Sequence, residues 1–332
     1  MSNITIEEIA RRADVSIATV SRIINHKDTV KPETRQRVLD VMEELNFQPK
    51  SPSSINDSTS KVILMCVPDF SNPFNSPVID GVQKAAHEYE YDVLLLQSKD
   101  FYTDSSDYLN IIKNNSLAGI LILSSAPTNQ LLKELCFRCP VVMCSEYAED
   151  YGVSYVSIDD FEGARKAVNY LISTGCKKIG MINSNKKFKY ARHREKGYIA
   201  ALEEAGLEQN PDWICHISSI NYNLALSNAK HILSLKNRPD ALFSSSDVFA
   251  VAAVRAAKEL NLRIPEDVSI IGFDNIELSV ICDPKITTVE QPSFEIGFQA
   301  CELLIEKIKN PGIADKQIIL NTELIVREST KM

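Results

Sequence analysis

Two cysteines three positions apart are the first residues whose spacing could do chemistry. Cys136 and Cys139 form a C-x-x-C pair and Cys144 follows five residues later, which is the spacing of half a zinc site or of a redox pair. No second C-x-x-C and no H-x-x-x-H supplies the missing ligands. The eight cysteines lie mostly in apolar segments, where a thiol behaves as a small hydrophobe. We therefore expect no metal and no cofactor.

Several catalytic signatures are missing from the chain. The sequence contains no G-x-G, no GK[ST], no G-x-S-x-G and no H-E-x-x-H, which excludes the common nucleotide-binding and hydrolase motifs. No paired acid and base stands out either. The sequence favours a binding protein over an enzyme, with an enzyme acting on a sugar phosphate as an alternative.

Three short helices are expected in the first fifty residues. Thr5 and Glu8 form a capping box, which starts a helix at Ile6. Ser16 can cap a second helix, and a third can begin at Pro32. The first two helices are separated by a turn of about three residues, which is helix-turn-helix spacing.

The second of these helices carries side chains suited to nucleic acid. Its polar residues can contact phosphates and base edges, and Arg22 can bind guanine through two hydrogen bonds. The first fifty residues hold as many basic as acidic residues, so the net charge of −8 lies on the remainder. DNA affinity must then come from placed contacts. On spacing alone, a three-helix domain without nucleic acid remains an alternative.

The stretch VSIATVSRIIN, followed by TRQRVLDVMEELNFQP, resembles the headpiece of the lactose and purine repressor (LacI/GalR) family of bacterial transcription regulators. Residues 15–25 match the family pattern V-S-x-x-T-V-S-R-x-[IVL]-N at every fixed position. The resemblance implies a repressor that binds a pseudopalindromic operator as a homodimer. Ile17 and Ala18 fall at base-reading positions and, being apolar, could contact thymine methyl groups. The expected DNA-binding residues are Thr5, Ser16, Ile17, Ala18, Thr19, Ser21, Arg22, Asn25 and Ile55.

Residues 51–60, SPSSINDSTS, are expected to form a flexible polar linker. Most members of the family place a hinge helix here, which enters the minor groove. Pro52 and the serines oppose such a helix, and Ile55 is the one plausible wedge.

From Lys61 onward, continuous apolar strands alternate with amphipathic helices in two series. This pattern predicts parallel sheets covered on both faces. The expected fold class is α/β, a two-lobed body like a periplasmic binding protein behind an all-α headpiece, with a ligand cleft between the lobes. The expected units are a headpiece (1–50), a linker (51–60), a first lobe (61–160 and 291–320) and a second lobe (161–290 and 321–332).

The resemblance also implies residues for an effector. The loop at Asn72 and Phe74 faces the cleft in the family, and Asn75 stands where a second aromatic is usual. Arg194 matches R-x-x-G-[YFW], and Asp274 lies in the family's GFDN signature. The expected effector-binding residues are Asn72, Phe74, Asn75, His193, Arg194, Tyr222, Ser246, Asp247, Asp274 and Gln291.

Some of these residues have ordinary alternatives. Arg194 could be a solvated helix charge, Asp247 an N-terminal helix cap and Gln291 hinge scaffold.

Between Lys186 and Arg194 the chain carries six basic residues and no acidic one. In an acidic body this run would be a positive focus for a carboxylate or phosphate, which favours a sugar acid or a sugar phosphate as effector. The alternative is a solvated loop.

The longest apolar run, residues 248–254, is far shorter than the roughly 20 residues that span a bilayer. The N-terminus has no signal-peptide pattern, so a cytoplasmic location is expected. No heptad tail follows the last strand-like segment, IILNTELIV, which favours a dimer over a tetramer. The rival hypothesis is a two-lobed sugar-binding protein without DNA function.

Overall fold

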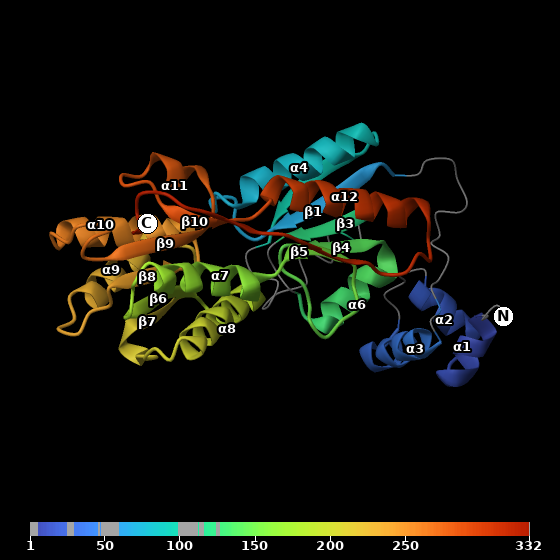
Figure 1. The fold of residues 1–332 in the computed structure, drawn as a ribbon. Helices are drawn as coiled ribbons and strands as arrows, with labels where there is room; N and C mark the ends of the chain where they lie inside the picture. The colour runs from blue at the N-terminus through green and yellow to red at the C-terminus, as the bar shows by residue number, and fades with distance from the viewer. Residues whose placement is uncertain are drawn as a thin grey trace.

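The computed structural model describes residues 6–24, 30–45, 47, 60–98, 112, 116–123 and 127–331. A small helical headpiece lies beside one end of an elongated body made of two α/β lobes (Figure 1). The expected fold class is confirmed.

The headpiece and first lobe contain α1 (Ile6–Arg12), α2 (Ile17–Ile24), α3 (Pro32–Glu44), β1 (Val62–Val67), α4 (Asn75–Glu88), β2 (Asp92–Gln97), β3 (Gly119–Leu123), α6 (Asn129–Arg138), β4 (Val141–Cys144) and β5 (Tyr155–Ile158). The remaining elements are α7 (Asp160–Ser173), β6 (Ile179–Ser184), α8 (Lys189–Glu204), η2 (Pro211–Trp213), β7 (Ile214–Ile217), α9 (Tyr222–Leu233), β8 (Ala241–Ser244), α10 (Asp247–Glu259), β9 (Ser269–Asp274), α11 (Glu277–Ile281), β10 (Thr287–Glu290), α12 (Ser293–Lys309), β11 (Gln317–Leu320) and β12 (Glu323–Ile325).

The headpiece has the expected helix boundaries. The hydroxyl of Ser16 accepts a 3.1 Å hydrogen bond from the backbone N–H of Thr19, which confirms Ser16 as the cap of α2. The third helix begins at Pro32, also as expected. The headpiece core consists of Ile9, Ala10, Ala13, Val20, Ile23, Val38, Val41 and Met42.

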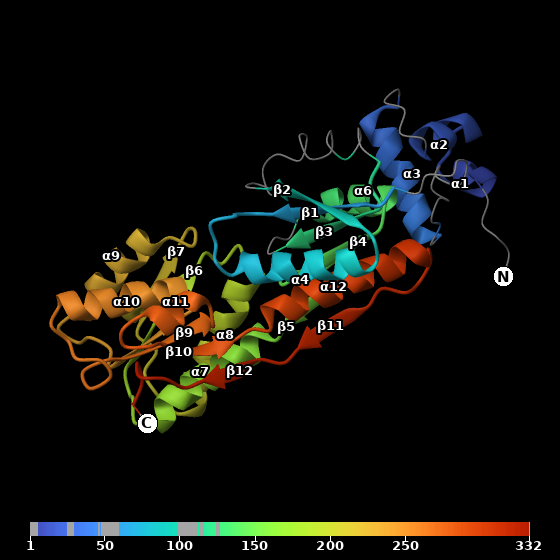
Figure 2. The same ribbon diagram turned by 90° about the horizontal axis from the view of Figure 1, so that it is seen from above.

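The sheet of the first lobe has the strand order β11-β5-β4-β3-β1-β2, with every pairing parallel. Side chains of β1 alternate between two cores: Ile63 packs in the cluster of α4 and α12, and Leu64 in the cluster of α6. Helices on both faces (Figure 2) bury β1, β3, β4 and β5, which explains their continuous apolar sequences. The edge strand β2 is partly exposed.

The sheet of the second lobe has the order β12-β10-β9-β8-β6-β7, parallel except for the antiparallel pair β10 and β12. Helices α7 and α8 pack together, as do α9 and α10. The carboxyl ends of β8, β9 and β10 bring Ser245, Asp274 and Gln291 to one edge, where a doubly wound sheet binds ligands.

The chain passes between the two sheets three times: from β5 to α7, from β10 to α12 and from β11 to β12. The apolar segment IILNTELIV therefore forms two strands and not one, and it divides at the expected boundary between residues 320 and 321. Its first half, β11, lies in the first sheet and its second half, β12, in the other. The break falls at Asn321 and Thr322, where the segment crosses between lobes.

Glycines allow helix backbones to touch in both lobes. A Cβ atom at Gly81 of α4 would lie 2.0 Å from the carbonyl oxygen of Phe294 in α12, and one at Gly297 would lie 2.0 Å from that of Val78. In the second lobe, a Cβ at Gly197 of α8 would lie 2.2 Å from the carbonyl oxygen of Phe161 in α7. At these three positions the neighbouring helix leaves no room for a Cβ atom, so only glycine fits.

Candidate functional site

Arg194 is the centre of a buried polar network at the edge of the second sheet. Helix α8 places it, and only 4% of the residue is exposed. Its Nε donates to Asp160 Oδ1 over 2.9 Å, and its Nη1 donates to the carbonyl oxygen of Ser245 over 2.6 Å. The guanidinium also lies against Phe273, 3.5 Å from the ring centre. Arg194 is thus a fixed, buried cation and not a solvated helix charge.

Asp274 continues this network from the end of β9. Its Oδ1 lies 3.5 Å from Arg194 Nη1 and accepts a 2.6 Å hydrogen bond from Gln291 Nε2. Its Oδ2 accepts from the hydroxyl of Ser246 over 3.0 Å. Burial raises the pKa of Asp274 to about 6, against the opposing effect of Arg194. The structure therefore brings Arg194, Ser246, Asp274 and Gln291 together.

Three buried polar atoms of residues expected near the ligand, or next to them in the sequence, have no hydrogen-bond partner among the described residues. Ser245 Oγ and Gln291 Oε1 are of this kind at the edge of the second sheet, and Asn75 Oδ1 is of this kind in the first lobe. Buried polar atoms are normally paired. These atoms are candidates to bind a small polar molecule.

Asp247 lies next to the network but serves the fold. Ser246, not Asp247, is the cap of α10. Asp247 Oδ2 accepts from the backbone N–H of Ile276 and Oδ1 from the hydroxyl of Thr288, over 2.9 and 2.7 Å. With both oxygens used and the residue fully buried, Asp247 holds α10 to the following loop and strand. Its inclusion among ligand-binding residues is not supported.

The expected residues of the first lobe lie at the start of α4. Asn75 donates through Nδ2 to the carbonyl oxygen of Asp69 over 2.7 Å, and Asn72 Oδ1 accepts from the backbone N–H of Phe74 over 3.2 Å. Phe74 and Asn75 are both buried. The loop is therefore fixed by its own hydrogen bonds.

Two other expected residues lie apart from the Arg194 network. Tyr222 is the first residue of α9 and 37% exposed, and no described polar or ring contact joins it to Arg194 or Asp274. His193 Nε2 lies 2.9 Å from Glu149 Oε1 of the first lobe. The structure places His193 in an inter-lobe contact.

The expected positive focus between Lys186 and Arg194 is wrong, because carboxylates outside the run neutralise most of its charge. Arg192 and His193 share Glu149, Lys189 and Arg194 share Asp160, and Lys186 pairs with Glu195. Two of these partners could not be predicted from the run itself, because Glu149 and Asp160 lie 29 to 44 residues away in sequence from the cations with which they pair.

Two carboxylates of this region were missed as site residues. Glu146 Oε2 and Oε1 accept from the backbone N–H groups of Lys189 and Tyr190, over 2.9 and 2.7 Å. Asp160 lies between Lys189 and Arg194. Both carboxylates stand within two residues of the end of a buried strand, a position that could have marked them.

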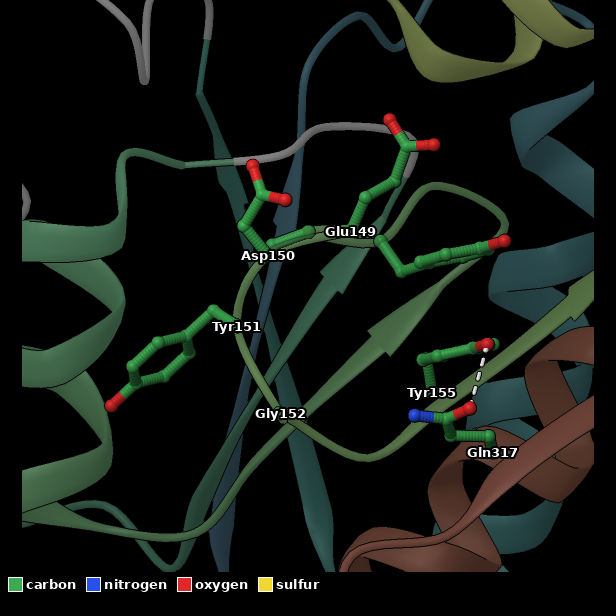
Figure 3. A pocket seen from close by; sticks show the side chains of 8 residues that line it. Glu149, Asp150, Tyr151, Gly152, Tyr155 and Gln317 are labelled. Carbon is green, nitrogen blue, oxygen red and sulfur yellow. Dashed lines mark hydrogen bonds between the residues drawn. The ribbon is translucent and has the colours of Figure 1, made fainter.

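Two hollows adjoin the loop between β4 and β5. A cavity of about 170 Å³ is lined by Pro127 and Asn129 of the first lobe and by Lys187, Lys189 and Arg192 of the second. A larger hollow of about 480 Å³ lies over Tyr155 and Gln317 (Figure 3). Tyr147 stacks on Tyr155 with ring centres 3.9 Å apart, and the Nζ of Lys189 lies 4.2 Å from the ring centre of Tyr147. The loop thus joins the second lobe to the first sheet.

The cysteine side chains are in the thiol form. All eight are free, and burial raises the pKa of the Cys66 and Cys139 thiols to about 12. No group of three potential metal ligands occurs among the described residues. Among the described helices, none is both long and apolar enough to cross a membrane.

The expected DNA-binding surface is only partly within the described residues. Ile17 is 52% exposed at the start of α2, and the hydroxyls of Ser16 and Thr19 are 2.8 Å apart. Ala18, Ser21 and Arg22 belong to α2, but their side chains lie outside the described part, as do Thr5, Asn25 and Ile55.

Comparison with known proteins identifies both parts of this architecture. Residues 5–50 match the family model "Bacterial regulatory proteins, lacI family", and residues 168–330 match "Periplasmic binding protein-like domain". The HTH-type transcriptional repressor CytR of Escherichia coli (strain K12) is 34% identical over 329 residues, covering 98% of this chain and 96% of that protein. The chain belongs to the lacI family of bacterial regulatory proteins.

Other members of the lacI family are similar over the same length. The repressor PurR of Photobacterium profundum is 31% identical, with 98% of each chain covered. The solved structure of the transcriptional regulator CelR in complex with cellobiose superposes with a TM-score of 0.76 at 28% identity, covering 98% of this chain and 100% of that one.

The protein is therefore a ligand-responsive DNA-binding transcriptional regulator and not an enzyme. Its headpiece match argues against a two-lobed binding protein without DNA function.

Proposed function

We propose that this protein is a homodimeric repressor whose operator binding responds to a neutral, hydroxyl-rich sugar held between the lobes. Binding of the sugar and of the operator are then linked, so the ligand shifts the protein between operator-binding and non-binding states. The regulated genes would serve carbohydrate metabolism or a related pathway.

The observation that carries the sugar proposal is the buried network of Arg194, Asp274 and Gln291. It offers fixed donors and acceptors beside the unpaired Ser245 Oγ and Gln291 Oε1. A ligand with several hydroxyl groups can satisfy both kinds of atom, because each hydroxyl donates and accepts. The related CelR structure contains cellobiose, a sugar without charge.

Charge pairing favours a neutral ligand over a sugar acid or sugar phosphate. Arg194 and Lys189 already share Asp160, and Arg194 lies near Asp274. An anion would have to compete with these buried carboxylates. The proposed effector-binding residues are Asn75, Arg194, Ser246, Asp274 and Gln291, with Asn72, Phe74 and Tyr222 as walls and His193 at the rim.

Exposed apolar side chains support the homodimer. Val280 and Ile281 of α11 are 45% and 69% exposed, and Leu94 and Leu95 of the edge strand β2 are 52% and 40% exposed. A partner that covered these side chains would remove their apolar surface from water. Both lobes would then contribute to the dimer, and two headpieces would contact two half-sites of the operator.

We further propose that residues 1–50 form the DNA-binding unit, residues 51–60 the linker and the two lobes the effector-binding body, with operator contacts from α2 centred on Arg22. The protein would act in the cytoplasm, where it meets the operator.

A thermal-shift screen of the full-length protein tests the effector proposal. The panel contains neutral sugars including cellobiose, sugar acids, sugar phosphates, nucleosides and nucleobases. We expect a neutral sugar to raise the melting temperature and to change the affinity for a duplex that the protein selects from a random pool. Stabilisation by charged sugars or nucleobases alone would overturn the proposal.

A further inference from the structure

The headpiece lies against helix α6 of its own body (Figure 2). Lys133 Nζ of α6 lies 2.6 Å from Glu43 Oε2 and 3.9 Å from Asp40 Oδ1, both on α3. A second ion pair has the charges the other way round: Nη2 of Arg35 in α3 lies 3.8 Å from Oε1 of Glu134 in α6. The contact therefore has matched charges on both sides.

An apolar side chain completes this contact. Phe137, one turn beyond Lys133 on α6, packs against the headpiece core of residues such as Val38 and Val41. A side chain of the body thus extends the core of the headpiece. Apolar burial combined with matched charges fixes an orientation better than either alone.

The ion pairs of this contact that join described residues do not involve the recognition helix α2. They use α3, while Ile17 on α2 remains 52% exposed. Two acidic groups of α3, Asp40 and Glu43, face Lys133 of the body, which neutralises them, and so they do not oppose the phosphates of a duplex. Docking and operator binding use different faces of the headpiece.

We propose that α6 is the docking face for the headpiece and that this contact orients the headpiece for the operator. A headpiece held in one orientation loses less freedom on binding than one on a free tether. The docked arrangement therefore raises operator affinity.

The loop between β4 and β5 links the docking face to the second lobe. On one side, Glu146 and Glu149 of this loop hold the start of α8. On the other, Tyr151 points toward α6 (Figure 3), and burial together with the nearby Cys136 and Glu43 raises its pKa. Movement of the second lobe can thus reach the headpiece contact through this one loop.

Charge reversal on the body tests the proposal. Lys133→Glu places a carboxylate against Glu43 and Asp40 without altering the headpiece. We expect faster amide hydrogen exchange in residues 32–44 of the free protein, and about tenfold weaker binding to a duplex selected from a random pool. The pair Glu43→Lys with Lys133→Glu should restore slow exchange in α3.

Lys196→Glu is the matched control, because Lys196 is an exposed lysine on α8 and the change in net charge is identical. Phe137→Ala provides a second variant without any charge change and should also speed exchange in α3. Equal exchange in wild type, Lys133→Glu and Phe137→Ala would show that no docking occurs. Unchanged or tighter operator binding by Lys133→Glu, relative to Lys196→Glu, would overturn the orienting role.

Discussion

Glu146 and Lys189 lie in different lobes, yet the carboxylate of Glu146 accepts a 2.9 Å hydrogen bond from the backbone N–H of Lys189. A second bond, from the N–H of Tyr190, makes Glu146 the cap of α8. A carboxylate at this end of a helix also interacts favourably with the helix dipole. The first lobe thus supplies a helix cap to the second.

Glu146→Gln should change how stability depends on pH. Burial raises the pKa of Glu146 from its ordinary 4.5 to about 7, so the folded protein holds this proton where the unfolded chain has lost it. The contribution of Glu146 to stability therefore falls as pH rises from about 4.5 to about 7, by up to about 3 kcal/mol. Denaturant unfolding between pH 4.5 and 8 should show a flatter profile for Glu146→Gln. An unaltered slope, matching that of the exposed control Glu203→Gln, would contradict this account.

Arg194→Ala should remove both stability and the ligand response. The substitution leaves Asp160 with Lys189 as its remaining ion-pair partner among the described residues and takes a cation away from Asp274. We expect a loss of about 2 to 4 kcal/mol in the free energy of unfolding, as for other broken buried pairs. The ligand-induced thermal shift should disappear, while operator affinity stays unchanged.

The control for Arg194 is Arg165→Ala. Arg165 pairs with Glu162 and Glu204, but at a side chain that is 33% exposed, so its loss should cost less than about 1 kcal/mol. Equal losses of unfolding free energy in the two variants would mean that burial of the Arg194 network does not add to stability.

Arg22→Ala should weaken operator binding by about 1 to 3 kcal/mol and relax the preference at one base position. Selection of duplexes from a random pool, followed by binding measurements on cognate and scrambled DNA, checks both effects. Arg11→Ala is the comparison, because Arg11 belongs to α1 and pairs with Glu8. If Arg22→Ala binds cognate and scrambled DNA in the wild-type ratio, Arg22 does not read a base.

Ile281→Asp should weaken the homodimer. Ile281 is 69% exposed, and a charge there would be costly only if a partner covers it. Sedimentation velocity should show a larger monomer fraction for Ile281→Asp than for wild type. Leu224→Asp, at a residue of α9 that is 44% exposed, should leave the dimer intact. A wild-type monomer fraction for Ile281→Asp would place the interface elsewhere.

Local patterns predicted most of the fold. The continuous apolar strands, the Ser16 cap and the helix start at Pro32 are determined by residues close together in the sequence, and the structure shows all three as expected. The division of IILNTELIV between the two sheets leaves no mark on its hydrophobicity, and the boundary expected at residues 320 and 321 came from the family resemblance.

The site was only partly predictable, for a physical reason. The family motifs indicated Arg194 and Asp274, which the structure joins through one network. Asp160, which neutralises Arg194, lies 34 residues away in sequence, and Glu146 lies in the other lobe. Because such partners are distant in sequence, the run from Lys186 to Arg194 looked positively charged, although carboxylates neutralise most of its charge in the folded protein.

The glycine contacts of the helix pairs limit how the lobes can move. Because α4 touches α12 at Gly81 and Gly297, and α7 touches α8 at Gly197, neither pair can slide without steric clash. Each lobe must then turn as a rigid body, with the three crossing segments as its pivot. Motion of a hinge type, and not shear, is what this packing permits. Gln291 lies at the second crossing, so the hydrogen bond from Gln291 to Asp274 is close to the axis of that rotation.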